Sequence, residues 1–304
     1  MSFSSDTKKE LCRCENKRKE EIMAECYGML IFSRYFSEKQ IVLHTESASV
    51  ADRCMNMLAE NFGVIAEKSA VLTQRHGGGK IFTVSVVSQE NCKKIFHYFG
   101  YSAKQVSRRI NYALFEDDLC ISAFLRGAFL SCGSVNNPEK DYHLEFAVAY
   151  KNLCNDLVKI ISTAERLLYT LKVVERKGIY VAYLKDSEQI SDLLAFINAP
   201  VASVQIIENK IIKEIRNNTN RKINSEVANM KKTITASMKQ QKAIEKIKAT
   251  IGLENLSEEL RQVALLRLEN PDMSLREIGE NTIPPMSRSG VNHRMQKLME
   301  LAEE

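Results

Sequence analysis

The chain has 304 residues, 44% of them hydrophobic, which is enough for two domains with ordinary globular cores. Its first residues, MSFSSDTKKELCRCENKRK, include basic side chains but no apolar segment behind them. No run approaches the roughly 18 apolar residues of a membrane span. Composition therefore argues against a signal peptide and a transmembrane helix, and we expect a cytoplasmic protein without a membrane partner.

The cysteines form no CxxC pair, and the sequence has no paired histidine motif. This pattern indicates neither a zinc site nor a redox dithiol, so we expect no metal, no cofactor and no small-molecule substrate. The thiols should be reduced, most of them filling the core. They are Cys12, Cys14, Cys26, Cys54, Cys92, Cys120, Cys132 and Cys154.

The net charge of +5 is unevenly distributed. Residues 201–250 hold 11 Lys+Arg against 4 Asp+Glu, a surplus of +7, whereas residues 1–200 hold 26 Lys+Arg against 24 Asp+Glu. A basic block of this kind favours contact with nucleic-acid phosphates, with a solvated lysine-rich helix face as the alternative.

The first hundred residues predict the order helix, strand, strand, helix, strand, strand, helix. The predicted helices are 17–28, 49–61 and 90–99. The predicted strands are 29–35, 40–44, 64–73 and 80–87, the last two joined by a turn at Gly77-Gly78-Gly79.

The same order of elements is predicted again about 100 residues later, with a glycine turn at the equivalent position. Its predicted helices are 117–131, 155–170 and 187–197. Its predicted strands are 142–149, 171–175 and 179–184, the last two joined at Lys177-Gly178, with a short strand before Asn136. The sequence therefore predicts a duplicated αββαββα module, with repeats at about 17–100 and 117–198, paired about a pseudo-two-fold axis.

The segment FLRGAFLSCGS, residues 124–134, resembles the LAGLIDADG helix of homing endonucleases, with Gly127 and Gly133 matching the glycines of that family. The resemblance implies two such helices that pack through small residues, each carrying an acid to a divalent metal. Cys132 stands where the acid before the last glycine should be, and Leu130 occupies the other acidic position.

In the first copy we match Gly28 to the last glycine of the motif, so Tyr27 takes the place of the acid. An acid at a helix C-terminus faces the negative end of the helix dipole and needs a bound cation, so Cys and Tyr remove the metal site and the unfavourable charge together. We therefore expect no catalytic residue and no metal ligand. Glu25 could serve as a ligand only in a shifted register.

A basic helical connector follows the duplicated module. Residues 201–216 have apolar side chains at helical spacing, and a polar break at 217–220 precedes another helical pattern that ends at Gly252. We take this break as the boundary between domains 1–216 and 217–304. Ser257 caps a further helix, 258–268.

Residues 274–301 predict a helix-turn-helix. Ser274 and Glu277 form a capping box for the first helix, and Pro284-Pro285 cannot continue it. Ser287 then caps a second helix whose buried stripe should be Val291, Met295 and Leu298.

The opposite face of the second helix carries hydrogen-bonding groups that can read base edges, framed by cations that can hold phosphates. Between residues 281 and 299 the only charged side chains are cationic, although residues 251–304 hold 6 Lys+Arg against 10 Asp+Glu. An ordinary amphipathic helix is the alternative. The predicted DNA contacts in the helix-turn-helix are Ser287, Arg288, Ser289, Asn292, His293, Arg294, Gln296 and Lys297; those in the connector are Asn220, Arg221, Asn229, Lys231 and Lys232.

This order of domains is similar to that of the WhiA family, the sporulation and cell-division regulators of Gram-positive bacteria. The similar stretches are MSFSSDTKKEL, FLRGAFLSCGSVNNPEKDYHLEF, the segment 220–229 and LRLENPDMSLREIGENTIPPMSRSGVNHRMQKL, in which SRSGVNHR is the strongest signal. The resemblance implies an α+β fold, a degenerate LAGLIDADG-like domain followed by a small all-α helix-turn-helix domain. It also implies a nucleoid-associated transcription regulator that binds double-stranded DNA and does not cleave it.

Two rival functions remain. The first domain could instead be a protein-interaction or ligand-sensing platform, for other transcription or cell-division proteins, with DNA contact only through the second domain. A metal-dependent endonuclease is the other rival, and the missing acids argue against it.

Overall fold

The computed structural model describes residues 2–72, 79–103, 107–167 and 169–303, so Gly77 and Gly78 of the first predicted turn lie outside the described residues. The chain divides into two compact units, residues 1–213 and 214–304. Each is described by itself below. Helix α8 (Pro200–Thr250) contributes its first turns to the first unit and the rest to the second.

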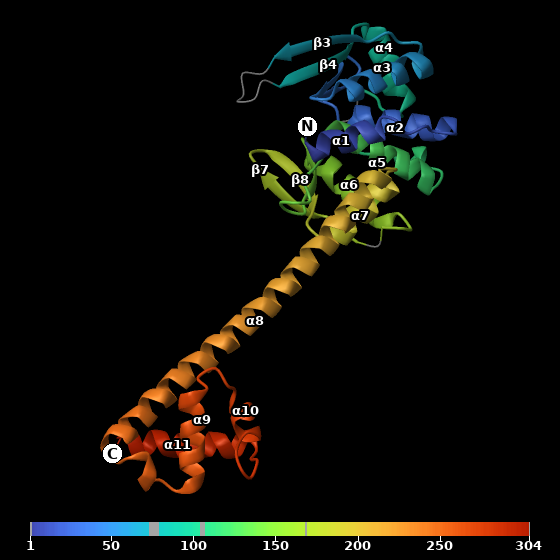
Figure 1. The fold of residues 1–304 in the computed structure, drawn as a ribbon. Coiled ribbons are helices and arrows are strands. Elements are labelled where there is room, and N and C mark those ends of the chain that lie inside the picture. Colours follow the sequence, from blue (N-terminus) through green and yellow to red (C-terminus); the bar gives the residue numbers. More distant parts are fainter. Residues whose placement is uncertain (1, 73–78, 104–106, 168, 304) are drawn as a thin grey trace. The chain divides into compact units, whose positions relative to one another are not determined.

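The described residues of the first unit form two four-stranded antiparallel sheets with the same order, β1-β2-β4-β3 and β5-β6-β8-β7 (Figure 1). The strands of the first sheet are β1 (Tyr35–Phe36), β2 (Ile41–Thr45), β3 (Glu67–Leu72) and β4 (Lys80–Val86). Those of the second are β5 (Gly133–Val135), β6 (Leu144–Val148), β7 (Lys172–Arg176) and β8 (Ile179–Leu184). The helices of this unit are α1 (Phe3–Leu11), α2 (Lys19–Ile31), α3 (Ala48–Phe62), α4 (Gln89–Tyr98), α5 (Asp118–Cys132), α6 (Lys151–Thr163) and α7 (Ser187–Phe196).

The matching strand orders confirm the predicted duplication. The second hairpin turns at Lys177 and Gly178, whose φ angles of 50° and 77° are both left-handed, as a two-residue hairpin turn requires. The short strand expected before Asn136 is β5.

Helices α2 and α5, one from each repeat, lie side by side where the two repeats meet (Figure 1). A Cβ on Gly28 would sit 2.2 Å from the carbonyl oxygen of Phe124, and a Cβ on Gly127 would sit 2.1 Å from that of Glu25. Each glycine therefore lets the other helix's backbone approach where a side chain could not fit. The two contacts are mutual, so Gly28 and Gly127 are equivalent positions, 99 residues apart.

The predicted elements differ most from the structure in three places. Residues 29–31 continue α2 instead of starting a strand, because this apolar run is buried in the helix pair, and a short apolar run does not distinguish a helix from a strand. The predicted helix 155–170 is α6, which begins at Lys151 and ends at Thr163. The polar residues 217–220 do not interrupt α8.

Helix α1 was not predicted from the sequence. Ser2 caps it by accepting a hydrogen bond from the Ser5 backbone N–H at 3.2 Å. Leu11 is fully buried in the core of the first unit, so this nine-residue helix is packed against the fold.

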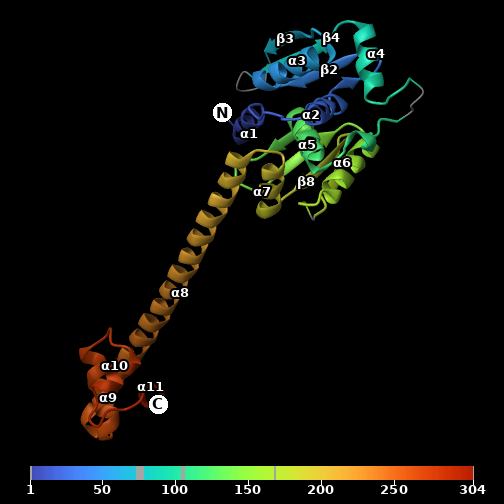
Figure 2. The same cartoon turned by 90° about the vertical axis from the view of Figure 1, so that its right-hand side faces the viewer.

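The second unit is all-helical, as predicted. It contains the rest of α8, a 3₁₀ turn (Leu253–Asn255), α9 (Glu258–Glu269), α10 (Leu275–Glu280) and α11 (Arg288–Glu303). The last three helices gather at the C-terminal end of α8 (Figure 2). Their core also includes Ile244 and Ile247 of α8, both with 0% exposure, so this end of α8 belongs to the fold of the unit.

Within the described ranges, no helix is long and apolar enough to cross a membrane.

Candidate nucleic-acid interface

The capping box at the start of α10 is present. Ser274 Oγ accepts a hydrogen bond from the Glu277 backbone N–H at 3.3 Å, and the Glu277 carboxylate accepts one from the Ser274 backbone N–H at 2.7 Å. These bonds hold the pKa of Glu277 below its usual value. They satisfy the first orphan amides of a helix only six residues long.

The turn between α10 and α11 is built on Gly279. Its carbonyl accepts hydrogen bonds from the Met286 backbone N–H at 2.9 Å and from Thr282 Oγ1 at 2.8 Å. A Cβ on Gly279 would lie 2.3 Å from the Met286 carbonyl oxygen, so only glycine allows this approach. The turn therefore fixes the angle at which α11 leaves it.

Helix α11 starts and packs as the sequence predicts. Ser287 Oγ accepts a hydrogen bond from the Gly290 backbone N–H at 3.2 Å, which caps the first turn. Val291, Met295 and Leu298 are buried against α9 and α10 with exposed fractions of 0%, 1% and 0%. The rotation of the helix is thereby set, and so is the face that it turns to solvent.

Most of the predicted contacts in this segment lie on the solvent face. Asn292 and Gln296 offer amide groups one helical turn apart, and His293 and Lys297 lie beside them. The exposed residues at the start and along this face are Ser287, Arg288, Ser289, Asn292, His293, Gln296 and Lys297.

Arg294 differs from these residues because its guanidinium is held by the protein. Its Nη2 lies 2.5 Å from Glu259 Oε2 of α9, and its Nη1 donates to the Gly290 carbonyl at 3.2 Å. This ion pair ties α11 to α9, although its exposed carboxylate limits its strength. Arg294 is placed to orient α11.

The predicted contacts in the connector are all exposed on α8, where every residue from 214 to 236 faces solvent. They precede Ser237, where α8 first becomes buried in this unit. With a rise of about 1.5 Å per residue, Lys232 lies about 8 Å and Asn220 about 25 Å before Ser237 along the helix axis. The connector residues thus lie on a fully exposed stretch of α8, which we call the strip on α8, before the part of the helix that packs in this unit.

Two further side chains hold the segment between α9 and α10, and the sequence did not predict them. The carbonyl of Pro271 accepts hydrogen bonds from Ser237 Oγ at 2.7 Å and from Arg267 Nη1 at 3.2 Å. Arg267 is only 2% exposed and also donates to the Met273 carbonyl at 2.6 Å. No local pattern marks this arginine, because its partners depend on how the chain turns after α9.

The LAGLIDADG-like helices have no acid at the motif position. The equivalence of Gly28 and Gly127 places Ser33, not Tyr27, opposite Cys132, so the predicted register of the first copy was wrong. Tyr27 is instead a buried core residue whose hydroxyl lies 2.6 Å from that of Tyr101. Burial raises the pKa of Cys132 to about 12, so its thiol stays protonated and is a poor metal ligand.

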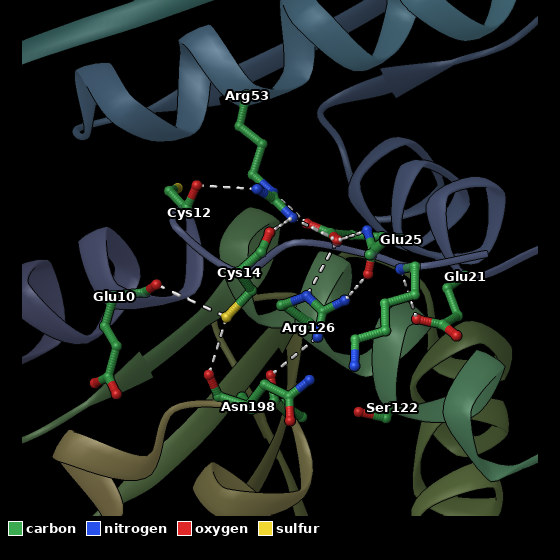
Figure 3. Close-up of polar contacts among 12 residues, drawn as sticks. Glu10, Cys12, Cys14, Glu21, Glu25, Arg53, Ser122, Arg126 and Asn198 are labelled. Atoms are coloured by element: carbon green, nitrogen blue, oxygen red, sulfur yellow. Dashed lines mark hydrogen bonds and ion pairs between the residues drawn. The ribbon is translucent and has the colours of Figure 1, made fainter. Parts of the chain in front are cut away.

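Glu25 is committed to two arginines (Figure 3). Its carboxylate accepts hydrogen bonds from Arg53 Nε at 2.5 Å and Nη2 at 2.8 Å and from Arg126 Nε at 3.0 Å. It also accepts one from Asn16 Nδ2 at 2.6 Å. It is fully buried, whereas a catalytic metal would have to meet DNA. In the described part of the chain, no cluster of three His, Cys, Asp or Glu side chains could hold a metal ion.

Comparison with known proteins agrees with both halves of the chain. Residues 121–216 match the WhiA LAGLIDADG-like domain, and residues 219–302 match the WhiA C-terminal HTH domain. The chain is 36% identical to the probable cell division proteins WhiA of Clostridium botulinum and Alkaliphilus metalliredigens, over 100% of this chain and 98% of each relative.

The fold is also similar to the crystal structure of full-length DUF199/WhiA from Thermatoga maritima. The TM-score is 0.60 at 25% identity, covering 100% of this chain and 98% of the other. With a duplicated LAGLIDADG-like unit, a helix-turn-helix and full-length relatives of this kind, the chain belongs to the WhiA family of DNA-binding regulators.

Proposed function

We propose that the chain is a sequence-specific transcription regulator that binds double-stranded DNA at the nucleoid, in the cytoplasm, and does not cleave it. The observation that carries this proposal is the solvent face of α11, where Asn292, His293 and Gln296 are exposed on a helix held rigidly by its buried side. Amide and imidazole groups on such a helix can pair with base edges in the major groove. The cell-division names of the relatives support target genes of sporulation, cell division or chromosome segregation.

In this proposal, one element recognises the bases and another binds the phosphates. The α11 face reads bases, with Ser287, Arg288, Ser289 and Lys297 around it. The strip on α8, which comprises Asn220, Arg221, Asn229, Lys231 and Lys232, holds phosphates, because lysine and arginine charges attract the backbone whatever the sequence. We place the functional boundary at residues 216–217, so that the whole strip belongs to the DNA-binding domain 217–304.

Arg294 is a weaker candidate for a DNA contact. Its guanidinium would have to leave Glu259 before it could bind a phosphate. We therefore assign it a positioning role in the free protein.

The absence of nuclease activity is supported by the chemistry of the motif. A metal-dependent nuclease needs carboxylates or neutral imidazoles that face the DNA. Here the two motif positions hold Ser33 and Cys132, and Ser33 Oγ is turned to the backbone carbonyls of Leu30 and Tyr35 at 2.6 and 3.0 Å. Glu25 is neutralised by arginines.

Salt titration of DNA binding tests the proposal. Each phosphate contact adds about 0.9 to the slope of log K against log salt, so four to six contacts predict a slope of roughly −4 to −5. The preferred sequence is found by selection from random duplexes, and a scrambled duplex is the control. A slope near zero, or equal affinity for selected and scrambled duplexes, would contradict the assignment.

The charge balance of the first unit favours a second candidate function for that unit alone. Residues 1–200 hold 26 Lys+Arg and 24 Asp+Glu, which gives no surplus for phosphates. We therefore also consider it a platform for proteins or ligands. Genome-wide mapping of bound sites for the full chain and for a truncation beginning near Asn217 separates the two: identical sites would favour the platform.

A further inference from the structure

A cavity of about 680 Å³ opens between the two repeats of the first unit. Phe36, Phe96 and Tyr101 line it from the first repeat, and Tyr150 and Asn152 line it from the second. Its volume is within the range of small-molecule sites, roughly 300–1,000 Å³. Neither the DNA-binding face nor the LAGLIDADG motif includes these residues.

Three aromatic rings form one wall of the cavity. The ring of Phe96 stacks on Tyr101 with centroids 5.1 Å apart, and Phe36 meets both rings edge-on at 5.2 and 5.5 Å. Phe36 and Tyr101 are fixed in the core, with exposed fractions of 2% and 6%. The wall is therefore rigid and apolar, which suits a flat ring.

The cavity is also lined by a guanidinium that no carboxylate neutralises, that of Arg108. Arg108 donates to the carbonyls of Phe36 at 2.9 Å and Ile31 at 3.3 Å, and its charge lies 4.9 Å from the centroid of Tyr150. No acidic side chain among the described residues pairs with it. Burial lowers the pKa of Arg108. A bound anion would offset this cost, because it would supply the missing negative charge.

The remaining charges around the cavity favour an anion as well. Lys39 and Lys151 line it, and the single lining carboxylate, Glu38, is hydrogen-bonded to His97 Nε2 at 2.6 Å. Helix α6 also begins at the cavity, since Tyr150 is its N-cap and makes no side-chain bond to the first turn. Its open amides add positive potential next to Arg108.

We propose that this cavity binds a small organic anion with a planar aromatic ring. The ring would lie against Phe36, Phe96 and Tyr101, and the anionic group would pair with Arg108. Two classes of ligand have these two features, aromatic carboxylates and nucleoside monophosphates. The site would make the first unit a ligand-binding unit, and it does not depend on the DNA contacts of the second unit.

Calorimetric titration of the full chain with 4-hydroxybenzoate, adenosine monophosphate and inorganic phosphate tests the proposal. We expect one of the two aromatic anions to bind and inorganic phosphate to bind more weakly, because phosphate lacks the ring. Which aromatic anion binds identifies the class of ligand. Failure of both to bind at millimolar concentration, or phosphate binding as tightly as either, overturns the proposal.

Variants then locate the site. Arg108→Gln should weaken binding by about ten- to one-hundred-fold, the value of a lost charge-assisted hydrogen bond. Arg34→Gln is the matched control, because Arg34 also lies over a tyrosine ring, at 5.6 Å from Tyr35, but outside the cavity lining. Equal affinity in Arg108→Gln and the unmodified chain overturns the proposal.

Lys39 and Lys151 are exposed, so changing them tests the proposal without disturbing the core. The double variant Lys39→Ala, Lys151→Ala should weaken binding about two- to fivefold and reduce its salt dependence. Lys172→Ala on β7 is the control and should have no effect. If Arg108→Gln does not fold, this double variant decides, and unchanged affinity in it contradicts the assignment.

Discussion

At the scale of single residues, Asn292 is the side chain most directly tied to sequence reading. It is exposed on α11, next to the fully buried Val291, so its direction is fixed by the core. An amide offers one donor and one acceptor, the pattern that pairs with an adenine edge in the major groove.

Asn292→Ala should therefore cost about 1–3 kcal/mol of binding free energy on the preferred site and little on random DNA. Competition binding with specific and scrambled duplexes measures the ratio. Glu300→Gln, an exposed change on the same helix, is the control for fold and charge. A specificity ratio that does not change in Asn292→Ala would place the reading element elsewhere.

Glu25 gives a residue-scale test of stability. Glu25→Gln removes the negative charge between Arg53 and Arg126 and leaves two partly or fully buried guanidiniums without a counter-ion. Breaking one side of a buried charge network costs about 3–5 kcal/mol of unfolding free energy. Urea unfolding measures it.

Asp52→Asn is the matched control for Glu25→Gln. Asp52 precedes Arg53 on α3 and pairs with Lys68, but its side chain is 59% exposed. An exposed pair contributes about 0–1 kcal/mol. Similar losses for the two variants would mean that the Glu25 network is solvated.

At the scale of elements, the contact between α2 and α5 depends on a pair of glycines. Gly127→Ala would bring a methyl group within 2.1 Å of the Glu25 carbonyl oxygen, so the helices would have to separate. We expect a loss of about 1–3 kcal/mol of unfolding free energy, since overpacking outweighs the gain of about 1 kcal/mol in helix propensity.

Gly290→Ala is the control for that gain. A Cβ there would meet its neighbours at 3.4 Å or more, an ordinary contact, so the variant should fold at least as stably as the unmodified chain. Thermal and urea unfolding of both variants give the comparison. Equal stability of the two variants would show that the α2 and α5 backbones are not in close contact.

Helix α8 is the element that we expect to hold the DNA backbone. Lys231→Ala with Lys232→Ala removes two exposed charges from it without touching the packed end of the helix. Affinity for specific and random DNA should fall about equally, and the salt slope should decrease by roughly 1–2. Binding at several salt concentrations measures both. A loss of affinity for the specific site alone would show that α8 contributes to sequence recognition.

At the scale of the whole molecule, we expect that neither unit cleaves DNA. Purified protein incubated with Mg²⁺ or Mn²⁺ and supercoiled DNA that carries its binding site should leave the DNA intact, because Ser33 and Cys132 replace the motif acids. Metal-dependent nicking that disappears in Glu25→Gln would show that Glu25 is a ligand after all.

The sequence by itself determined the features that are local along the chain. The capping box of Ser274 and Glu277, the cap at Ser287 and the stripe Val291, Met295 and Leu298 were all predicted, and all are present. Caps act within one turn and a helical stripe repeats every 3.6 residues, so both are visible in a short window. The repeated order of elements was visible for the same reason.

Tertiary structure decided what depends on residues far apart in the chain. Two contacts join positions about 100 residues apart: the approach of α2 to α5 at Gly28 and Gly127 and the ion pair of Glu25 with Arg126. The extension of α2 to Ile31 depends on burial in the same helix pair. Tertiary packing also decides that Arg294 pairs with Glu259 and that Arg108 has no acidic partner among the described residues. No local pattern encodes such contacts, because burial and charge partners are set only when the helices and sheets pack together.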